Sequence, residues 1–426
     1  MKKLEEMRNT LKEVAEKTAE LEKSAQELEA EGTGINLEPT KIQNEIRDLV
    51  RKIAEDKLRP LVRRFDIEAE YPLEFMKLLG TLNFLGVYIP EEFGGLNEGT
   101  VAMVLIMEEI AKVCPGTATS FGANALGTYP ILFSGTDEQK KKYLPKVASG
   151  EFLAAFGLTE PGSGSDAMAM TTRAVLDGNE YILNGQKQFI TSAGRADFYS
   201  IFARTKAREA EGGLSRGISC FIVEKNTPGL SFGKKEEKMG LHCSETRAIF
   251  FDNCRVPKEN LIGGKEGRGV GTLLNTLHHS RIVISGQGLG LAQGARTIAF
   301  DYAKKREQFG RPISENQAIS HKLANMEVQI EAARCLIYRA AWYADNKYPK
   351  DQISKFGAMA KLFSSEMAFD VANKALQVCG GIGYMRDFMM EKYVRDARVM
   401  TLYEGTSEMM LEEIFHILLK ESNRGK

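Results

Sequence analysis

The chain of 426 residues is 43% hydrophobic and 27% charged, which is ordinary for a globular protein of two or three packed domains and excludes a largely disordered one. Lysine plus arginine and aspartate plus glutamate balance at 57 each, so no overall charge draws the molecule toward nucleic acid or an anionic membrane. Any binding site must therefore be a local feature of the chain.

Signals for targeting, membrane insertion and metal binding are missing from the sequence. The N-terminus lacks the apolar core of a secretory signal, and no run approaches the roughly 18 apolar residues that a membrane-spanning helix requires. The six cysteines form no C-x-x-C pair and the five histidines no H-E-x-x-H motif, which argues against a metal site. We expect a cytoplasmic protein with reduced thiols.

Residues 1–37 are predicted to form a helical extension and a linker. Apolar residues recur from Leu4 to Leu28 at alternating spacings of three and four, which is a heptad seam. The stretch "EGTGINLEP" then breaks the helix, so the segment from Glu31 to Asn36 is predicted to be the linker. The seam fits a coiled coil or a partner-binding helix as well as it fits a helix lying on the parent domain.

Three further domains follow from changes in pattern along the chain. Residues 38–152 repeat apolar positions at helical spacing, as in "VAMVLIMEEIAKV", and predict an α-helical domain. Residues 153–270 consist of short alternating or β-branched runs such as "FYSIFART" and "ISCFIVEK", and predict a compact β domain. Long helical patterns return in residues 271–426. Strand and helix blocks that are segregated in this way predict an α+β fold rather than a doubly wound α/β sheet.

The glycine-rich stretches differ in what they predict. "GQGLGLAQGA", which begins at Gly286, lacks the G-x-G-x-x-G spacing and lies in a helical pattern, so it favours close helix packing over a dinucleotide site. "FGLTEPGSGSD" predicts a loop whose hydroxyl and backbone N–H groups suit a polar ring or a phosphate. "NGQKQFITSAG" then places the aromatic face of Phe189 beside the hydroxyl of Thr191. Together these two stretches suit a flat heteroaromatic cofactor.

The stretch "LYEGTSE" interrupts a long helical run directly after a carboxylate, Glu404. A glycine inside a helix costs about 1 kcal/mol relative to alanine. The break at Gly405 therefore requires a functional explanation.

Six motifs follow one another along residues 38–420: "LTEPGSGSD", "NGQKQFITS", "KKREQFGRPISENQ", "QVCGGIGY", "EKYVRDAR" and "LYEGTSE". In this order and spacing they resemble the acyl-CoA dehydrogenases, the flavoproteins that desaturate CoA thioesters. The resemblance implies an N-terminal helical domain, a middle β-barrel-like or β-sandwich domain and a C-terminal four-helix bundle. It also implies a homotetramer, and electron-transferring flavoprotein as the partner that accepts the electrons.

Under this resemblance Glu404 is the catalytic base. It removes the α-proton of a bound acyl-CoA while a hydride leaves the β-carbon for the N5 atom of FAD, which yields a 2-enoyl-CoA. Gly405, without a side chain, lets the substrate pass close to the backbone. The base requires a water-poor pocket that raises its proton affinity, and the thioester oxygen requires hydrogen bonds, which the family provides from the backbone N–H of the base and a flavin ribityl hydroxyl.

The resemblance also assigns residues to the cofactor and the substrate. The residues expected around the flavin ring are Phe156, Leu158, Thr159, Ser165, Phe189, Thr191, Thr406 and Glu408. The residues expected to hold the adenosine diphosphate end of FAD across a subunit boundary are Arg306, Phe309, Gln317, Gln377, Gly380 and Gly381. The residues expected near CoA and the acyl chain are Ser165, His278, Arg281 and Gly405, and Arg281 is also expected to orient the loop around Glu404.

Three positions depart from the family pattern. Many relatives have Trp where this chain has Phe189, which keeps an aromatic face and loses the indole donor. Relatives often carry an acidic or amide residue where His278 stands, so the contacts near CoA or the acyl group differ there. A subgroup places the base at the position of Ser280, which cannot act as a base, so Glu404 keeps the role.

The sequence leaves the acyl group open. Glutaryl-CoA members carry an arginine shortly before the Tyr-Pro-Ile stretch, and Thr117 near that position disfavours glutaryl-CoA here. A dicarboxylic or aryl-substituted acyl-CoA remains an alternative if His278, His279 or a distant arginine supplies the charge. An enoyl-CoA reductase or an acyl-CoA oxidase would use the same motifs. The heptad seam leaves a non-catalytic interaction protein as a remote alternative.

Overall fold

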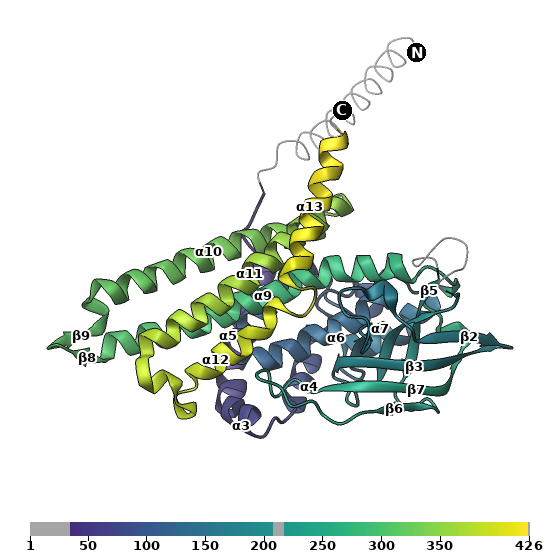
Figure 1. Ribbon diagram of the computed structural model, residues 1–426, viewed down its shortest axis with the longest axis horizontal. Helices are drawn as coiled ribbons and strands as arrows, with labels where there is room; N and C mark the ends of the chain where they lie inside the picture. The colour runs from purple at the N-terminus through teal and green to yellow at the C-terminus, as the bar shows by residue number, and fades with distance from the viewer. Residues whose placement is uncertain (1–34, 208–216, 425–426) are drawn as a thin grey trace, which may run out of the picture. The chain divides into compact units, whose positions relative to one another are not determined.

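The computed structural model describes residues 35–207 and 217–424, and the chain divides into two compact units, Met1–Glu38 and Pro39–Lys426. The predicted heptad seam from Leu4 to Leu28 lies outside the described residues. The fold described here is that of the second unit (Figure 1).

Helices make up the first part of this unit. They are α2 (Lys41–Ile53), α3 (Val62–Ile67), α4 (Leu73–Thr81), α5 (Gly99–Val113), α6 (Pro115–Ser134) and α7 (Asp137–Ala148). Local sequence explains several of their ends. Thr136 and Gln139 form a capping box at the start of α7, and Pro115 occupies the first turn of α6, where its missing N–H costs nothing.

The strands form one seven-stranded sheet in the middle of the unit. They are β1 (Ala154–Gly157), β2 (Arg173–Asp177), β3 (Glu180–Thr191), β4 (Phe198–Arg204), β5 (Ile218–Glu224), β6 (Leu230–Phe232) and β7 (Thr246–Pro257). The order is β1-β4-β2-β3-β7-β6, with β5 paired to β4. β1 runs parallel to β4, whereas β3 and β7 pair antiparallel with two register shifts, the second between Lys187 and Ile190. This second irregularity bends β3 just before Thr191.

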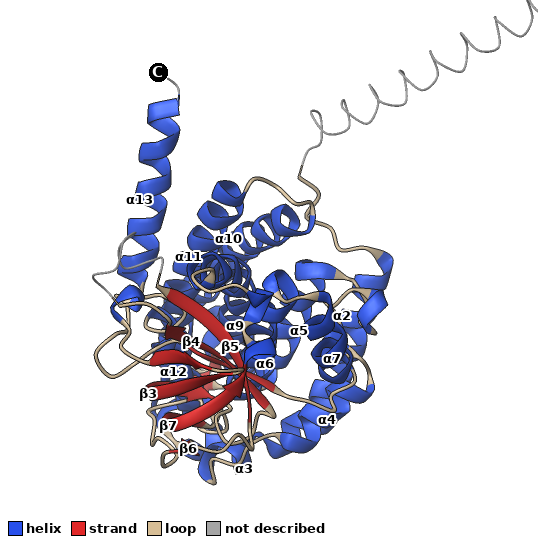
Figure 2. Ribbon diagram, turned by 90° about the vertical axis from the view of Figure 1, so that its right-hand side faces the viewer, coloured by secondary structure: helices blue, strands red, loops and turns tan. Residues whose placement is uncertain are grey.

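Long helices make up the last part. They are α9 (Gly269–Lys305), α10 (Gln317–Asp345), α11 (Lys350–Cys379), α12 (Met390–Arg398) and α13 (Ser407–Arg424), with a short hairpin of β8 (Glu307–Gln308) and β9 (Arg311–Pro312) after α9. Figure 1 shows α9, α10 and α11 side by side, extending away from the sheet. Figure 2 shows the strands gathered on one side with helices packed around them.

The glycine-rich part of α9 packs against its neighbours without side chains, as the sequence predicts. A Cβ atom on Gly288 would collide with the hydroxyl of Ser364 on α11, and one on Gly290 would collide with the carbonyl oxygen of Glu108 on α5. Small residues therefore let α9 lie close to both helices. This stretch is a packing device and not a nucleotide loop.

The predicted α+β class is confirmed, with helical first and last parts around a curled sheet. In the described part of the chain, none of the helices combines the length and the apolar character that crossing a membrane would require. The same residues contain no cluster of histidine, cysteine and acidic side chains that could hold a metal ion.

Candidate active site

Glu404 lies in a turn, residues 403–406, between α12 and α13, and its side chain faces a cavity of about 740 Å³. The turn adopts left-handed backbone conformations at Glu404 (φ 56°) and at Gly405 (φ 96°). Glycine alone adopts such a conformation without strain, and a Cβ at Gly405 would also lie 2.5 Å from Cε of Met410. The helix break in the sequence thus aims a carboxylate into a cavity.

The surroundings of Glu404 favour its neutral form. Burial raises the pKa of Glu404, while a hydrogen bond from the hydroxyl of Ser280 (2.9 Å to Oε2) and the charges of Arg281 and Lys361 act in the opposite direction. The net effect is that the pKa of Glu404 is raised above its ordinary value. A carboxyl group with a raised pKa binds a proton more tightly than an ordinary glutamate, as a base that must deprotonate a weak carbon acid requires.

Arg281 connects the turn to the surrounding helices. Its Nε donates to the carbonyl oxygen of Glu404 at 3.4 Å, and its Nη1 forms an ion pair with Glu413 on α13. Glu413 also accepts a hydrogen bond from Ser354 and lies 3.6 Å from Nε2 of His278. Burial lowers the pKa of His278 to about 4, so this histidine is neutral at pH 7. It therefore brings no charge to the site.

Antiparallel faces of α6 and α9 form a mostly apolar wall beside Glu404. The contributing residues are Thr119, Gly122, Ala123, Leu126 and Tyr129 on α6 and Leu277, Ser280, Arg281, Val283 and Ile284 on α9. Tyr403 also lines the cavity, and its hydroxyl donates to Oε1 of Gln287 on α9 (2.9 Å). The α6 face was not predictable from the sequence, because α6 is buried on nearly all sides and so shows no distinct stripe of cavity residues.

The loop after β1 and the end of β3 form another wall of the cavity. Phe189 is 63% exposed although it is a large aromatic residue, and it has a left-handed backbone (φ 59°) that turns its ring toward the cavity. Thr159, Ser165 and Thr191 line the cavity near it. An exposed aromatic face among hydroxyl groups matches a planar, polar ring.

A buried ion pair supports this wall from behind. Nζ of Lys187 lies 2.8 Å from Oε1 of Glu160 and donates to the carbonyl oxygen of Leu158 at 3.0 Å. Burial would raise the pKa of Glu160, but the charge and hydrogen bonds of Lys187 and of the Thr171–Thr172 segment lower it to about 2. Burial lowers the pKa of Lys187 to about 8 against the attraction of Glu160. The pair is ionised at pH 7 and fixes the backbone of the loop.

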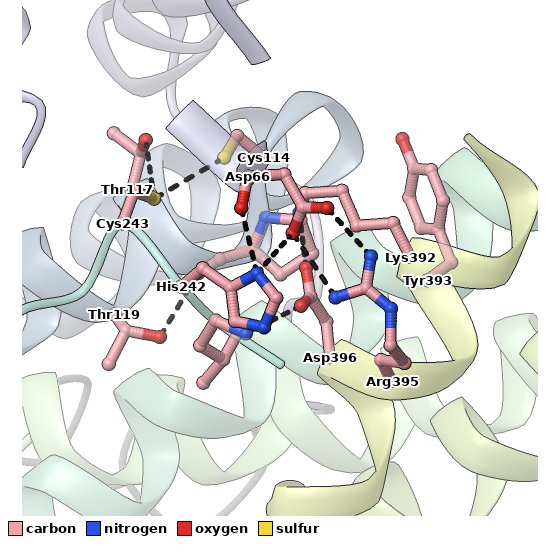
Figure 3. A network of polar contacts seen from close by, with 12 residues as sticks. Asp66, Cys114, Thr117, Thr119, His242, Cys243, Lys392, Tyr393, Arg395 and Asp396 are labelled. Atoms are coloured by element: carbon pink, nitrogen blue, oxygen red, sulfur yellow. Dashed lines mark hydrogen bonds and ion pairs between the residues drawn. The ribbon is translucent and has the colours of Figure 1, made fainter. Parts of the chain in front are cut away.

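A polar network holds the third wall, the segment 236–241 (Figure 3). Oδ1 of Asp396 accepts from the N–H of Leu241 at 2.6 Å, and Asp66 forms ion pairs with His242 (3.1 Å) and Arg395 (2.7 Å). The hydrogen bond to Asp66 raises the pKa of His242. The network ties the segment to α3 and α12 and keeps this wall of the cavity in place.

The cavity fits the flavin that the resemblance implies. Besides the exposed ring of Phe189, its wall contains the hydroxyl of Ser244, which is buried and has no hydrogen-bond partner among the described residues. A buried polar atom without a partner costs free energy, and a polar ligand in the cavity would remove that cost. A Cβ at Gly164 would meet nothing within 4 Å, so the loop leaves room there.

The structure brings some of the predicted residues together and places others elsewhere. The predicted residues that line the cavity are Phe156, Leu158, Thr159, Ser165, Phe189, Thr191, Arg281, Glu404, Gly405 and Thr406. Those that do not line it are His278, Arg306, Phe309, Gln317, Gln377, Gly380, Gly381 and Glu408. Most of the second group lie at the ends of α9, α10 and α11, and Phe309 at the tip of the β8–β9 hairpin is 97% exposed. Their predicted role across a subunit boundary stays a prediction.

Three family models match the second unit in order. They are the acyl-CoA dehydrogenase N-terminal domain (residues 40–151), middle domain (155–254) and C-terminal domain (267–419).

Individual relatives agree with this match. An acyl-CoA dehydrogenase of Bacillus subtilis (strain 168) is 43% identical over 371 residues, which cover 87% of this chain and 96% of the relative. A 3-(aryl)acrylate reductase of Clostridium sporogenes is also 43% identical, over 88% of this chain and 98% of the relative.

Solved structures share the fold. A chain in a structure of the electron transferring flavoprotein of Acidaminococcus fermentans has a TM-score of 0.87 at 43% identity and covers 90% of this chain and 99% of its own. Butyryl-CoA dehydrogenase of Megasphaera elsdenii has a TM-score of 0.86 at 39% identity, with 90% and 99% covered. On its domains, its relatives and the arrangement around Glu404, this chain belongs to the acyl-CoA dehydrogenase family, oxidoreductases that act on the CH–CH group of acyl-CoA.

Proposed function

We propose that this protein catalyses the FAD-dependent α,β-dehydrogenation of an acyl-CoA thioester, with Glu404 as the base. The observation that carries the proposal is the Glu404 carboxylate, held by a strained turn at the wall of the cavity with a raised pKa. The apolar faces of α6 and α9 lie beside it and would receive the acyl chain. The wall that contains Phe189 would receive the flavin ring.

In the proposed reaction, Glu404 takes the α-proton of the thioester. Burial stabilises the neutral acid that results, so the same desolvation that raises the pKa favours the proton transfer. The backbone N–H of Glu404 donates to no group in the described part of the chain, so it is free to bind the thioester oxygen on which negative charge develops. Bound FAD would accept the hydride that leaves the β-carbon.

The residues around these groups orient them and exclude water. Leu126, Leu277 and Ile284 give the acyl pocket an apolar surface, which keeps the base dehydrated. Thr159, Ser165 and Thr191 line the cavity and would supply hydroxyl groups to the flavin, and Gly405 and Thr406 line it next to Glu404. Electron-transferring flavoprotein as acceptor, a homotetramer and a cytoplasmic location complete the proposal on the strength of the family resemblance.

The reverse reaction, reduction of an enoyl-CoA, is a second candidate. Its support is that the 3-(aryl)acrylate reductase is as similar to this chain, at 43% identity, as the Bacillus dehydrogenase is. The same base and the same cavity serve both directions, because Glu404 would then return a proton to the α-carbon. The electron donor or acceptor decides whether the protein dehydrogenates an acyl-CoA or reduces an enoyl-CoA, and the geometry around Glu404 does not.

The deciding experiment is an anaerobic flavin-bleaching screen. The purified flavoprotein is mixed with a panel of saturated acyl-CoA thioesters that differ in length and branching and include carboxylated and aryl members. Loss of the visible flavin band with one member supports dehydrogenation and identifies the acyl group. If no saturated thioester bleaches the flavin, but enoyl-CoAs reoxidise the reduced protein, the reductase reading holds instead.

Glu404→Gln is the matched control for the screen. We expect this variant to keep its flavin and to bind acyl-CoA, because glutamine fills the same space, yet to bleach several orders of magnitude more slowly, because an amide cannot take the proton. Bleaching at the wild-type rate would show that another group is the base.

A further inference from the structure

Lys361 is a buried lysine that the mechanism above does not use. It lies on α11 with 1% of its surface exposed, and its ammonium group donates a hydrogen bond to the carbonyl oxygen of Gly405. A charged lysine that is removed from water needs a compensating partner. The partner here is the backbone directly after Glu404.

Two other buried lysines show what is unusual about Lys361. Lys187 pairs with Glu160, and Lys392 pairs with Asp396, so in each case a carboxylate is in contact with the ammonium group. Within residues 35–207 and 217–424, Lys361 has no carboxylate at ion-pair distance. Its charge is therefore not neutralised by direct contact and acts on the cavity beside it.

Lys361 and Arg281 each hold one carbonyl group of the turn, those of Gly405 and Glu404. Arg281 on α9 donates to the carbonyl oxygen of Glu404, and Lys361 on α11 donates to that of Gly405. Glu404 has a left-handed backbone, which a residue with a side chain keeps only where its surroundings enforce it. Two cationic donors from two different helices supply that enforcement.

We propose that Lys361 is a positioning residue for Glu404, which fixes the turn by its hydrogen bond to Gly405 and favours the carboxylate form of the base by its positive charge. The inference rests on the proposed function of Glu404 as the base. Arg281 cannot replace Lys361, because its guanidinium already binds Glu413 and the carbonyl oxygen of Glu404.

Charged groups from every neighbouring element act on Lys361. They are Glu404 in the turn, Arg281 on α9, Glu366 on α11 itself and Glu408 on α13. Burial lowers the pKa of Lys361 to about 8, and the attraction of Glu404 is the largest influence in the other direction. The positive charge is therefore present at pH 7 and is lost as the pH rises through about 8. Above that pH, Glu404 loses part of the attraction that favours its carboxylate form.

The test compares wild type, Lys361→Met and Lys361→Arg, with Lys374→Met as control. Methionine has nearly the length of lysine and no charge, arginine restores a permanent charge, and Lys374 is a half-exposed lysine on the same helix that pairs with Asp370. The first readout is the infrared band of the protonated Glu404 carboxyl group, identified by its loss in Glu404→Gln. The second is the pH profile of flavin bleaching.

We expect the pH midpoint of the infrared band to rise in Lys361→Met, and to stay at the wild-type value in Lys374→Met and close to it in Lys361→Arg. We expect flavin bleaching by Lys361→Met to be about 10²-fold slower at pH 7, which is the effect of displacing a catalytic group by about 1 Å. We also expect the bleaching rate of this variant to lack the change near pH 8 that loss of the Lys361 charge causes in the wild type. The proposal is overturned if folded, flavin-containing Lys361→Met keeps the wild-type infrared midpoint. It is also overturned if the bleaching rate of this variant still changes near pH 8 as that of the wild type does.

The two readouts separate this inference from the proposed function. If no thioester bleaches the wild-type flavin, dehydrogenation fails as the function, yet the infrared midpoint still reports whether Lys361 acts on Glu404. If bleaching occurs and Glu404→Gln abolishes it, the function holds, and Lys361→Met then decides the inference by itself.

Discussion

Ser280 acts on the protonation of Glu404 from the neighbouring helix. Its hydroxyl donates to Oε2 of Glu404 at 2.9 Å and opposes the effect of burial on the pKa of that carboxyl group. A hydrogen bond to a charged group contributes about 1.5–3 kcal/mol, and one pKa unit corresponds to about 1.36 kcal/mol.

Ser280→Ala is therefore expected to raise the pKa of Glu404 further above its ordinary value. The proposed base, Glu404, would act as a carboxylate, so the acid limb of the profile of kcat/KM against pH should move to higher pH, while the rate on the plateau changes little. Thr276→Ser, one turn earlier on α9 and outside the cavity wall, is the control and should leave the limb in place. A limb that moves to lower pH in Ser280→Ala would contradict this account of the base.

At the scale of single residues, the sequence identified those whose chemistry shows in a local pattern. Glu404 and Gly405 stand out because a glycine breaks a helix after a carboxylate, and Phe189 because an aromatic residue stands in a polar turn region. Tyr129 and Lys361 could not be found in this way. Each sits in a helix whose pattern is that of ordinary packing, and its place beside Glu404 depends on how α6, α9 and α11 meet.

At the scale of elements, β3 and the loop after β1 are joined by the buried pair of Lys187 and Glu160. The folded-state pKa of Glu160 is about 2, below its ordinary value of 4.5. The unfolded chain therefore binds more protons than the folded one between these two values. The stabilisation from Glu160 is fully present above about pH 4.5 and is lost as the pH falls through about 2.

Glu160→Gln is expected to lower the free energy of unfolding by about 3 kcal/mol at pH 7, because it leaves the Lys187 charge buried without a partner. The difference from wild type should shrink as the pH falls from 4.5 toward 2, and urea unfolding at several pH values measures it. Weaker retention of the flavin is expected as well, because the pair fixes the loop that lines the cavity.

Glu151→Gln is the matched control for this change. Glu151 pairs with Lys146 at 3.3 Å, but both side chains are about half exposed, so its removal should change stability by less than about 1 kcal/mol at every pH. A pH-independent effect of Glu160→Gln would show that the loss comes from packing and not from the ion pair.

The elements themselves were largely predictable from the sequence. Helix, strand and helix blocks have different periodicities, and the glycine-rich part of α9 was predicted to allow close packing, which Gly288 and Gly290 confirm. The order of the strands was not predictable. β1 lies beside β4 because of long-range pairing, and the segment 236–241 becomes a cavity wall because Asp396, far along the chain, binds its backbone.

At the scale of the whole molecule, the candidate active site draws on every part of the second unit. α6 comes from the first helical part, Phe189 from the sheet, and Ser280 and Glu404 from the last helices. The Glu404 carboxylate and the walls of the cavity that line it meet only when all three parts are folded together. The family models cover the same span, residues 40–419, and the described residues that line the cavity all lie within it.

Removal of residues 1–37 is therefore expected to leave the chemistry intact. The truncated protein should bind flavin with the same stoichiometry and should bleach with the same thioester at a rate within about twofold of the full chain, since it keeps Thr40 and Gln43, the capping box of α2. Flavin content from the absorption spectrum and single-turnover bleaching measure this, and the molar mass of both proteins by light scattering shows whether the heptad seam contributes to assembly. A lower mass with unchanged bleaching would give the seam a role in association alone, whereas a truncated protein without flavin would make the extension part of the folded unit and contradict the prediction.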